Sequence, residues 1–492
     1  MKMIKISGSA SGEDLGGPRG RGWDRPRPGK ASLDARAGPG GPALTAPRRP
    51  TPPAEERSYL LFVGAALALT LGAGLVLALF IPLAPDLGWD LDETALIQSH
   101  GWVQLQGWLG LMVAGMALRL VPRLAHRPPL PAALTLPPLG LMVSGTVLRL
   151  LTGMGLRVPF LLLSAAGFEA AGLGMVAAVL AWTLARSRGQ RESWRGAAWA
   201  ATGWWAMWAA LTALAGARAA LGGGLVPPAL DQASIWAVLL GAIGNVIWAI
   251  QSRSVPVFYG RQPPERLAPA LGLYNLGTTL VLVSATPPGI ALHQPGLGLA
   301  GAGVLWLAPL TGAIRGRPYR LRPPSRPAAR FVITANRWAL LAGGCLIAGA
   351  LSSAWSSGVA ARLDDAALHG LGLGLATTLI VGMARLLAPV FAVARAIPGG
   401  RSRSLGLIWL TLLAGTGSRL AAAPLEGTAP SWYQGLLGLA DLLTWLGLAA
   451  FALGFARAWL RQASRREALA RSARSGSRAT RDHYHGFHDY ER

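Results

Sequence analysis

Long apolar segments separated by short polar loops run through most of the chain. Each holds about 20 or more residues with almost no charge, and a helix of that length crosses a hydrocarbon core of roughly 30 Å. Apolar and polar positions do not alternate inside these segments as they do in a soluble domain. The pattern predicts an all-α polytopic membrane bundle of twelve transmembrane helices, at residues 58–82, 96–121, 132–151, 158–185, 196–220, 232–252, 267–288, 292–314, 332–354, 366–393, 404–423 and 432–460.

The charges of the loops predict how these helices cross the membrane. Every second loop is rich in arginine, as in residues 186–195, 253–266 and 315–330. The loops between them carry acids or few charges, as around Asp92 and Asp364. Because short cytoplasmic loops collect Lys and Arg, we expect both termini on the cytoplasmic side.

Composition agrees with a membrane protein and excludes other classes. The 492 residues are 52% hydrophobic and only 14% charged, whereas about a quarter of a soluble domain is charged. The net charge of +24 does not indicate nucleic-acid binding, because the arginines lie in short loops and tails, where topology and attraction to the lipid bilayer explain them. The single cysteine, Cys345, excludes an internal disulfide, a c-type haem motif and an iron–sulfur cluster.

The two ends of the chain differ from the apolar region between them. Residues 1–57 are rich in Gly, Pro and Arg and lack apolar periodicity, which is typical of a disordered tail. Residues 461–492 form a second basic tail. We therefore expect a twelve-helix transmembrane domain at 58–460 with one cytoplasmic tail at each end.

Three predicted helices share one sequence pattern, and they are four helices apart. Residues 107–124, 241–258 and 372–391 each contain glycines and then an apolar stretch. Each ends in an arginine followed by a proline at the inner end, the arginines being Arg119, Arg253 and Arg385. Glycines let helices or a flat ligand approach closely, and an interfacial arginine reaches towards water. Such features recur in unrelated bundles, but the even spacing favours three four-helix units around a pseudo-threefold axis.

Two histidines stand out in this repeat. His100 opens helix 2 and His369 opens helix 10, and both helices are expected to run inwards from the outer face. Gly107 and Gly372 lie on the faces of His100 and His369, respectively. Two imidazoles at one depth could ligate a haem iron, or they could be interfacial histidines with hydrogen-bonded partners. Helix 6 carries Ser234 and Trp236 at this depth and no histidine.

Two acids fall inside predicted membrane helices, Glu169 in helix 4 and Asp441 in helix 12. A carboxylate at this depth is expensive and marks a functional site by default. Arg149 and Arg218 are the candidate partners for these acids. A structural ion pair and a proton-relay or ligand role both remain open.

The stretches SHGWVQLQGWLGLMVAGMALRLVPRL (99–124) and LHGLGLGLATTLIVGMARLLAPVF (368–391), with GLMVSGTVLRLL and GFEAAG between them, resemble the NnrS family of membrane proteins. The resemblance covers roughly residues 58–460. It implies a bacterial inner-membrane protein that binds haem and copper and is linked to nitric oxide and nitrosative stress. The arrangement is also distantly similar to the catalytic subunit of haem–copper oxidases, where histidines on helices 2 and 10 hold a low-spin haem.

Carried over by position, the resemblance makes His100 and His369 the ligands of a haem, which would also be the metal site. The oxidase copper motif on helix 6 is missing, and the double histidine block of NnrS proteins is reduced to Ser99–His100. Copper and oxygen reduction are therefore not expected. We expect a haem protein of nitric oxide tolerance or electron transfer with a respiratory or nitric-oxide-related redox partner. The alternatives are a haem-free secondary transporter with Glu169 and Asp441 as its acids, and an assembly or sensing protein of a respiratory complex.

Overall fold

The computed structural model describes residues 58–83, 92–156, 158–187, 192–311, 314–318, 320–321, 323–387, 402–427 and 430–488. Throughout these residues the chain forms helices and turns and no strand, so the predicted all-helical class is confirmed. The predicted N-terminal tail, 1–57, lies outside them.

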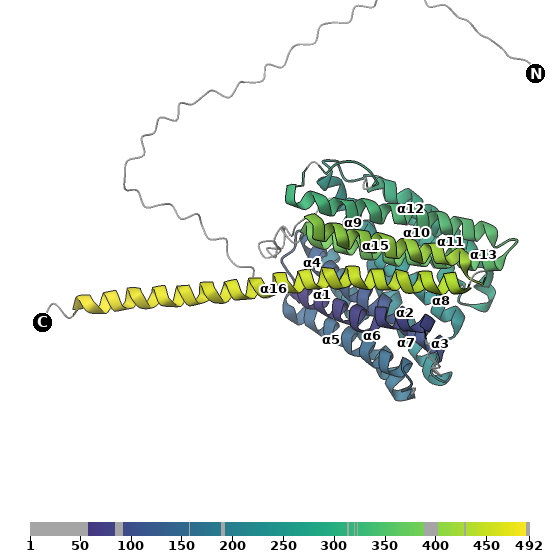
Figure 1. The fold of residues 1–492 in the computed structure, drawn as a ribbon, viewed down its shortest axis with the longest axis horizontal. Coiled ribbons are helices and arrows are strands. Elements are labelled where there is room, and N and C mark those ends of the chain that lie inside the picture. The colour runs from purple at the N-terminus through teal and green to yellow at the C-terminus, as the bar shows by residue number, and fades with distance from the viewer. Residues whose placement is uncertain are drawn as a thin grey trace, which may run out of the picture. The chain divides into compact units, whose positions relative to one another are not determined.

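Each predicted segment is helical over its described residues (Figure 1). Several segments are built from consecutive α-, π- and 3-10-helical pieces. The α-helices are α1 (Ser58–Leu69), α2 (Leu75–Phe80), α3 (Glu93–Trp102), α4 (Leu111–Leu124), α5 (Ala132–Gly153), α6 (Pro159–Ala185), α7 (Trp194–Leu221), α8 (Pro228–Trp236), α9 (Asn245–Phe258), α10 (Ala268–Val283), α11 (His293–Leu310), α12 (Ala329–Ser352), α13 (Ser357–His369), α14 (Thr378–Leu387), α15 (Ser402–Ala422) and α16 (Pro430–His488). The π-helical pieces are η2 (Thr70–Gly74), η4 (Val103–Gly110), η5 (Ala237–Gly244) and η8 (Gly370–Thr377), and the 3-10 pieces are η3 (Ile81–Leu83), η6 (Pro287–Leu292), η7 (Pro323–Ala328) and η10 (Ala423–Leu425).

Ten of these helical segments, among the described residues, are long and apolar enough to cross a membrane. The other two are α7, which spans 28 residues but is rich in tryptophan, glycine and threonine, and α10, which is apolar but only 16 residues long. The chain is therefore a multi-pass membrane protein in contact with the lipid bilayer.

Local sequence signals explain where several helices begin and end. Asp92 caps α3, because its side chain accepts a hydrogen bond from the Ala95 backbone N–H at 3.0 Å. Pro159 and Pro228 occupy the first turns of α6 and α8, where the missing N–H would have no partner. The helix α16 continues past the last apolar residues to His488, so most of the predicted second tail is helical.

The three repeat helices form the centre of the bundle. The apolar windows of α3–η4–α4, α8–η5–α9 and α13–η8–α14 are 94%, 89% and 72% buried, against 28–44% for the other seven candidate spans. Their π-helical pieces η4, η5 and η8 contact one another pairwise. A hydrogen bond of 2.9 Å from Trp108 Nε1 to Thr377 Oγ1 joins two of these pieces.

The π-helical pieces themselves follow a repeat that the sequence did not reveal. Each is eight residues long. The prolines of the repeat, Pro122, Pro256 and Pro389, each lie 19 residues after the first residue of the piece. Glycines in these pieces receive bulky side chains from neighbouring helices: Gly110 faces the Trp208 ring and Gly374 faces Trp338. The glycines thus serve helix packing at the centre of the bundle.

The repeat suggests that each proline ends its helix, but Pro122 and Pro256 lie two residues before the helix end, and Pro389 lies outside the described residues. Pro122 lies inside α4, which ends at Leu124, and Pro256 lies inside α9, which ends at Phe258. A proline in the last turn removes only one backbone hydrogen-bond donor. The helix therefore continues for two more residues before it ends.

Candidate functional site

His100 is held from the side by a neighbouring helix. It lies in α3, three residues before η4, and it is half-buried. Its Nδ1 atom lies 2.8 Å from the carbonyl oxygen of Gly74. Gly74 ends the π-helical piece η2 of the first span. The ring of His100 is therefore fixed by the backbone of a different helix.

His369 is held within its own helix. It ends α13, one residue before η8, so it lies at nearly the same level of the repeat as His100. Its Nδ1 atom is 2.9 Å from the carbonyl oxygen of Asp365 and 3.2 Å from the Asp365 Oδ1 atom. Arg419 of α15 binds the same carboxylate, with Nη2 2.9 Å from Oδ1 and Nη1 2.8 Å from Oδ2. Asp365 thus joins His369 to Arg419.

These contacts decide which ring nitrogen of each histidine carries the proton. A carbonyl oxygen can only accept a hydrogen bond, so Nδ1 of both neutral rings must be the donor. The lone pair is then on Nε2, and no described residue is hydrogen bonded to the Nε2 of His100 or His369. A histidine that ligates a metal through Nε2 almost always donates Nδ1–H to a carbonyl or carboxylate in this way.

The two histidines belong to one polar cluster, which we call the outer cluster: His100, His369, Asp365, Arg419 and Asp441. His100 lies within electrostatic range of His369 and Arg419. The same two groups act on Asp441, which lies in α16. His369 and Arg419 therefore link His100, Asp365 and Asp441 into one cluster from four spans, at the end of the bundle where α3 and α13 lie.

The two glycines of the predicted site have different surroundings. At Gly372 no other atom lies within 4 Å of the place where a Cβ atom would stand, and the same is true of Gly101 beside His100. At Gly107 a Cβ atom would lie 3.3 Å from Leu69 and 3.4 Å from Thr146. There is open space next to Gly101 and Gly372, whereas Gly107 packs against neighbouring helices.

Glu169 forms a buried ion pair with one of its two candidate partners. Arg149 Nε in α5 lies 3.0 Å from Glu169 Oε2 in α6, and the two side chains are 8% and 0% exposed. The Arg149 guanidinium also stacks on Trp102, 4.4 Å from the ring centroid. Glu169 Oε1 and Arg149 Nη2 have no hydrogen-bond partner among the described residues. The pairing with Arg149 that the sequence suggested is confirmed.

The three arginines of the repeat have three different environments. Arg253 forms an ion pair with Glu192 at 2.9 Å, and both side chains are about one-third exposed. Arg119 is buried under the Tyr59 ring, 5.7 Å from its centroid, and does not extend into water as expected. Arg385 is half-buried on the wall of an apolar cavity. The shared sequence pattern does not give these arginines a shared role.

Asp365 and Arg419 were not among the predicted site residues, although both left a signal in the sequence. Asp365 precedes His369 by four residues, which places the two side chains on one helix face. Arg419 is a charge inside an otherwise apolar segment, and such charges are functional candidates by default.

Comparison with known proteins adds no family to this description. No family model matches the chain, and no curated protein matches it. The functional proposal therefore depends on the side chains of the outer cluster and on the repeat.

Proposed function

We propose that this chain is a haem-binding protein of a bacterial inner membrane, similar to the NnrS family, with twelve transmembrane helices in an oxidase-like threefold arrangement. His100 and His369 would be the axial ligands. The observation that carries the proposal is the pair of Nδ1 contacts, which leave a lone pair on Nε2 of both rings. Both termini would lie in the cytoplasm, because the loops richest in arginine would then face inwards.

The repeat supports the oxidase-like arrangement. Three central helices, spaced evenly along the chain, carry π-helical pieces of equal length that meet one another. In this proposal α7 and α10 are the two further spans. Tryptophans in α7 would pack inside the bundle, as Trp205 and Trp208 do, so this helix needs less apolar character than a lipid-facing span.

The outer cluster also offers contacts for the carboxylate groups and the flat ring of a haem. A haem carries two carboxylate side groups, and a guanidinium binds carboxylates through paired hydrogen bonds. Arg419 binds the carboxylate that contacts His369 and lies within electrostatic range of His100. The open space beside Gly101 and Gly372 is where a flat ring could approach the helices.

Two imidazole ligands make a haem iron low-spin and suited to electron transfer. A single ligand would leave a position open for a diatomic gas such as nitric oxide. Ser234 and Trp236 occupy the level of helix 6 where an oxidase would need a copper-binding histidine, so oxygen reduction at copper is not part of the proposal.

The test is the absorption spectrum of the protein purified from cells supplied with haem. We expect a Soret band that is lost or shifted in both His100→Ala and His369→Ala. His293→Ala is the matched control, because His293 also begins a helix but its Nδ1 contacts the Ser284 hydroxyl at 3.1 Å. A colourless wild-type protein that is otherwise folded would refute the proposal.

A haem-free proton-coupled transporter is the second candidate, because the Arg149–Glu169 pair is buried and leaves an atom of each group without a partner. Such intramembrane carboxylates carry protons in many transporters. Loss of a proton-coupled flux in Glu169→Gln, with no haem in the wild type, would favour this function.

A further inference from the structure

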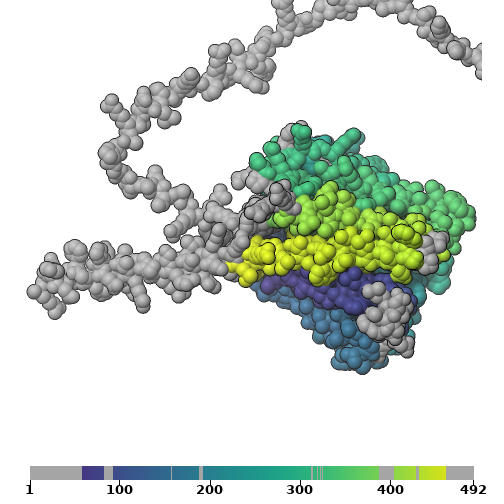
Figure 2. Space-filling view, viewed as in Figure 1, coloured from purple at the N-terminus to yellow at the C-terminus, as the bar shows by residue number. Residues whose placement is uncertain are grey.

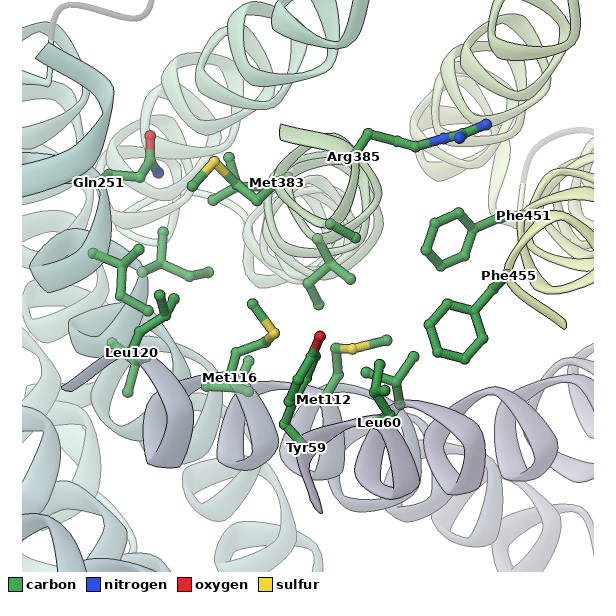
Figure 3. A pocket seen from close by; sticks show the side chains of 18 of the residues that line it. Tyr59, Leu60, Met112, Met116, Leu120, Gln251, Met383, Arg385, Phe451 and Phe455 are labelled. Atoms are coloured by element: carbon green, nitrogen blue, oxygen red, sulfur yellow. The ribbon is translucent and has the colours of Figure 1, made fainter. Parts of the chain in front are cut away.

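An apolar cavity lies on the inner side of the π-helical pieces, away from the outer cluster. It is lined by side chains of α1, α4, α9, α14 and α16 and has a volume of about 110 Å³ (Figure 3). Three of these helices, α4, α9 and α14, belong to the central repeat. The cavity therefore sits where the three repeat units meet.

One side of the cavity lies close to the surface of the bundle. The helices α1 and α16 are peripheral, and the space-filling view shows them side by side on the surface of the bundle (Figure 2). Leu60 and Phe451 from these helices line the cavity and are buried, whereas Gly454, Phe455 and Arg385 are partly exposed. A ligand dissolved in the bilayer could enter between α16 and the central helices.

A single amide group on this wall is fixed and has an unused donor. The Gln251 side chain is fully buried and lies at the edge of the cavity (Figure 3). Its Oε1 accepts a hydrogen bond of 2.9 Å from Asn336 Nδ2, and Asn336 Oδ1 accepts one from Thr311 at 3.3 Å. These contacts fix the orientation of the amide and use only its oxygen. The Nε2 atom has no hydrogen-bond partner among the described residues. A buried N–H without an acceptor is costly in apolar surroundings.

Two other polar side chains, Arg385 and Tyr59, line the cavity. Arg385 forms no hydrogen bond or ion pair with any described residue, and the sequence has no acidic residue between Asp365 and Glu426. The Tyr59 hydroxyl is directed into the cavity (Figure 3). The other lining side chains are aliphatic, aromatic or methionine. Gln251 and Arg385 thus offer hydrogen-bond donors to a ligand that is apolar and carries an oxygen acceptor.

We propose that this cavity binds the head group of an isoprenoid quinone. A quinone is a flat apolar ring whose carbonyl oxygens accept hydrogen bonds, and its chain is soluble in the bilayer. Gln251 Nε2 would donate to one carbonyl oxygen, and the ring would lie among Met112, Met116 and Phe451. An apolar cavity of about 150 Å³ in another protein holds benzene. The space here, about 110 Å³, is smaller, so the ring would extend through the opening beside Gly454 and Phe455, which are partly exposed. Nothing in this inference depends on haem being bound.

The experiment measures binding of decylubiquinone to the full chain in phosphatidylcholine nanodiscs by isothermal titration calorimetry. We expect saturable binding that weakens about five- to tenfold in Gln251→Met, the effect of one lost hydrogen bond. Leu379→Trp, which fills the cavity, should abolish binding, since Leu379 lines it. Leu407→Trp is the control, because Leu407 lies on the exposed side of α15 and outside the cavity.

Three outcomes would overturn the inference: no saturable binding to folded wild type, unchanged binding in both cavity variants, or phosphatidylglycerol that co-purifies with the protein and that decylubiquinone cannot displace. The last result would assign the cavity to a lipid chain with its phosphate at Arg385. A protein that binds decylubiquinone and has no Soret band would separate this site from the haem proposal, which would then fail alone.

Discussion

Removing the Glu169 carboxylate should destabilise the bundle far more than the loss of an ordinary salt bridge. A surface pair contributes about 0–1 kcal/mol, but the Arg149 and Glu169 side chains are 8% and 0% exposed. Glu169→Leu leaves a buried guanidinium without its hydrogen-bonded carboxylate, and breaking such a pair costs about 3–5 kcal/mol; Asp231, which also lies near Arg149, should keep the loss at the lower end of this range. We expect this loss in the free energy of unfolding, measured by denaturant titration in detergent micelles.

The double variant Arg149→Met/Glu169→Leu tests the reasoning. Since it removes both charges, most of the lost stability should return, leaving a deficit of about 1 kcal/mol from the contact between Arg149 and Trp102. A double variant that loses as much stability as Glu169→Leu and Arg149→Met lose together would refute the idea that the two charges act as a pair.

Three further predictions follow from the packing of the repeat and of the outer cluster. Gly374→Ala should lower the unfolding free energy by about 1–3 kcal/mol, because its Cβ atom would lie 2.7 Å from Trp338, whereas Gly372→Ala, beside open space, should change it by less than about 0.5 kcal/mol. Trp108→Phe should cost about 1 kcal/mol in the same titration, since it removes the hydrogen bond to Thr377 between two central helices. Arg419→Gln should lower the midpoint potential of a bound haem in a redox titration, because it removes a positive charge that disfavours the ferric state; an unchanged potential would place the haem elsewhere.

Much of the fold could be predicted because the local composition of a segment is enough to identify a membrane helix. The predicted segment 158–185 became α6 (Pro159–Ala185), and 132–151 became α5 (Ala132–Gly153). The segment 267–288 was predicted too long, since α10 ends at Val283 before the prolines at 287 and 288. The change from α- to π-helix in η4, η5 and η8 could not be predicted from these sequences, because most of their residues are buried and their apolar positions show no periodicity.

Some contacts of the candidate site could also be predicted from the sequence, and others could not. The pairing of Glu169 with Arg149 could be anticipated, because a charge inside a membrane helix needs an opposite charge nearby. The contact between His100 and the Gly74 carbonyl could not, because it joins a side chain to the backbone of another helix. Helix-to-helix register decides such contacts, and no single segment encodes it. The same reason explains why Arg419 emerged as a partner of Asp365 only in three dimensions.

The most direct measurement of the central claim is the electron paramagnetic resonance spectrum of the purified oxidised protein, with His100→Ala and His369→Ala beside the wild type. Two imidazole ligands predict a low-spin ferric signal in the wild type that becomes high-spin, or disappears with the haem, in each variant. A protein without haem, or a low-spin signal that survives both substitutions, would contradict the account.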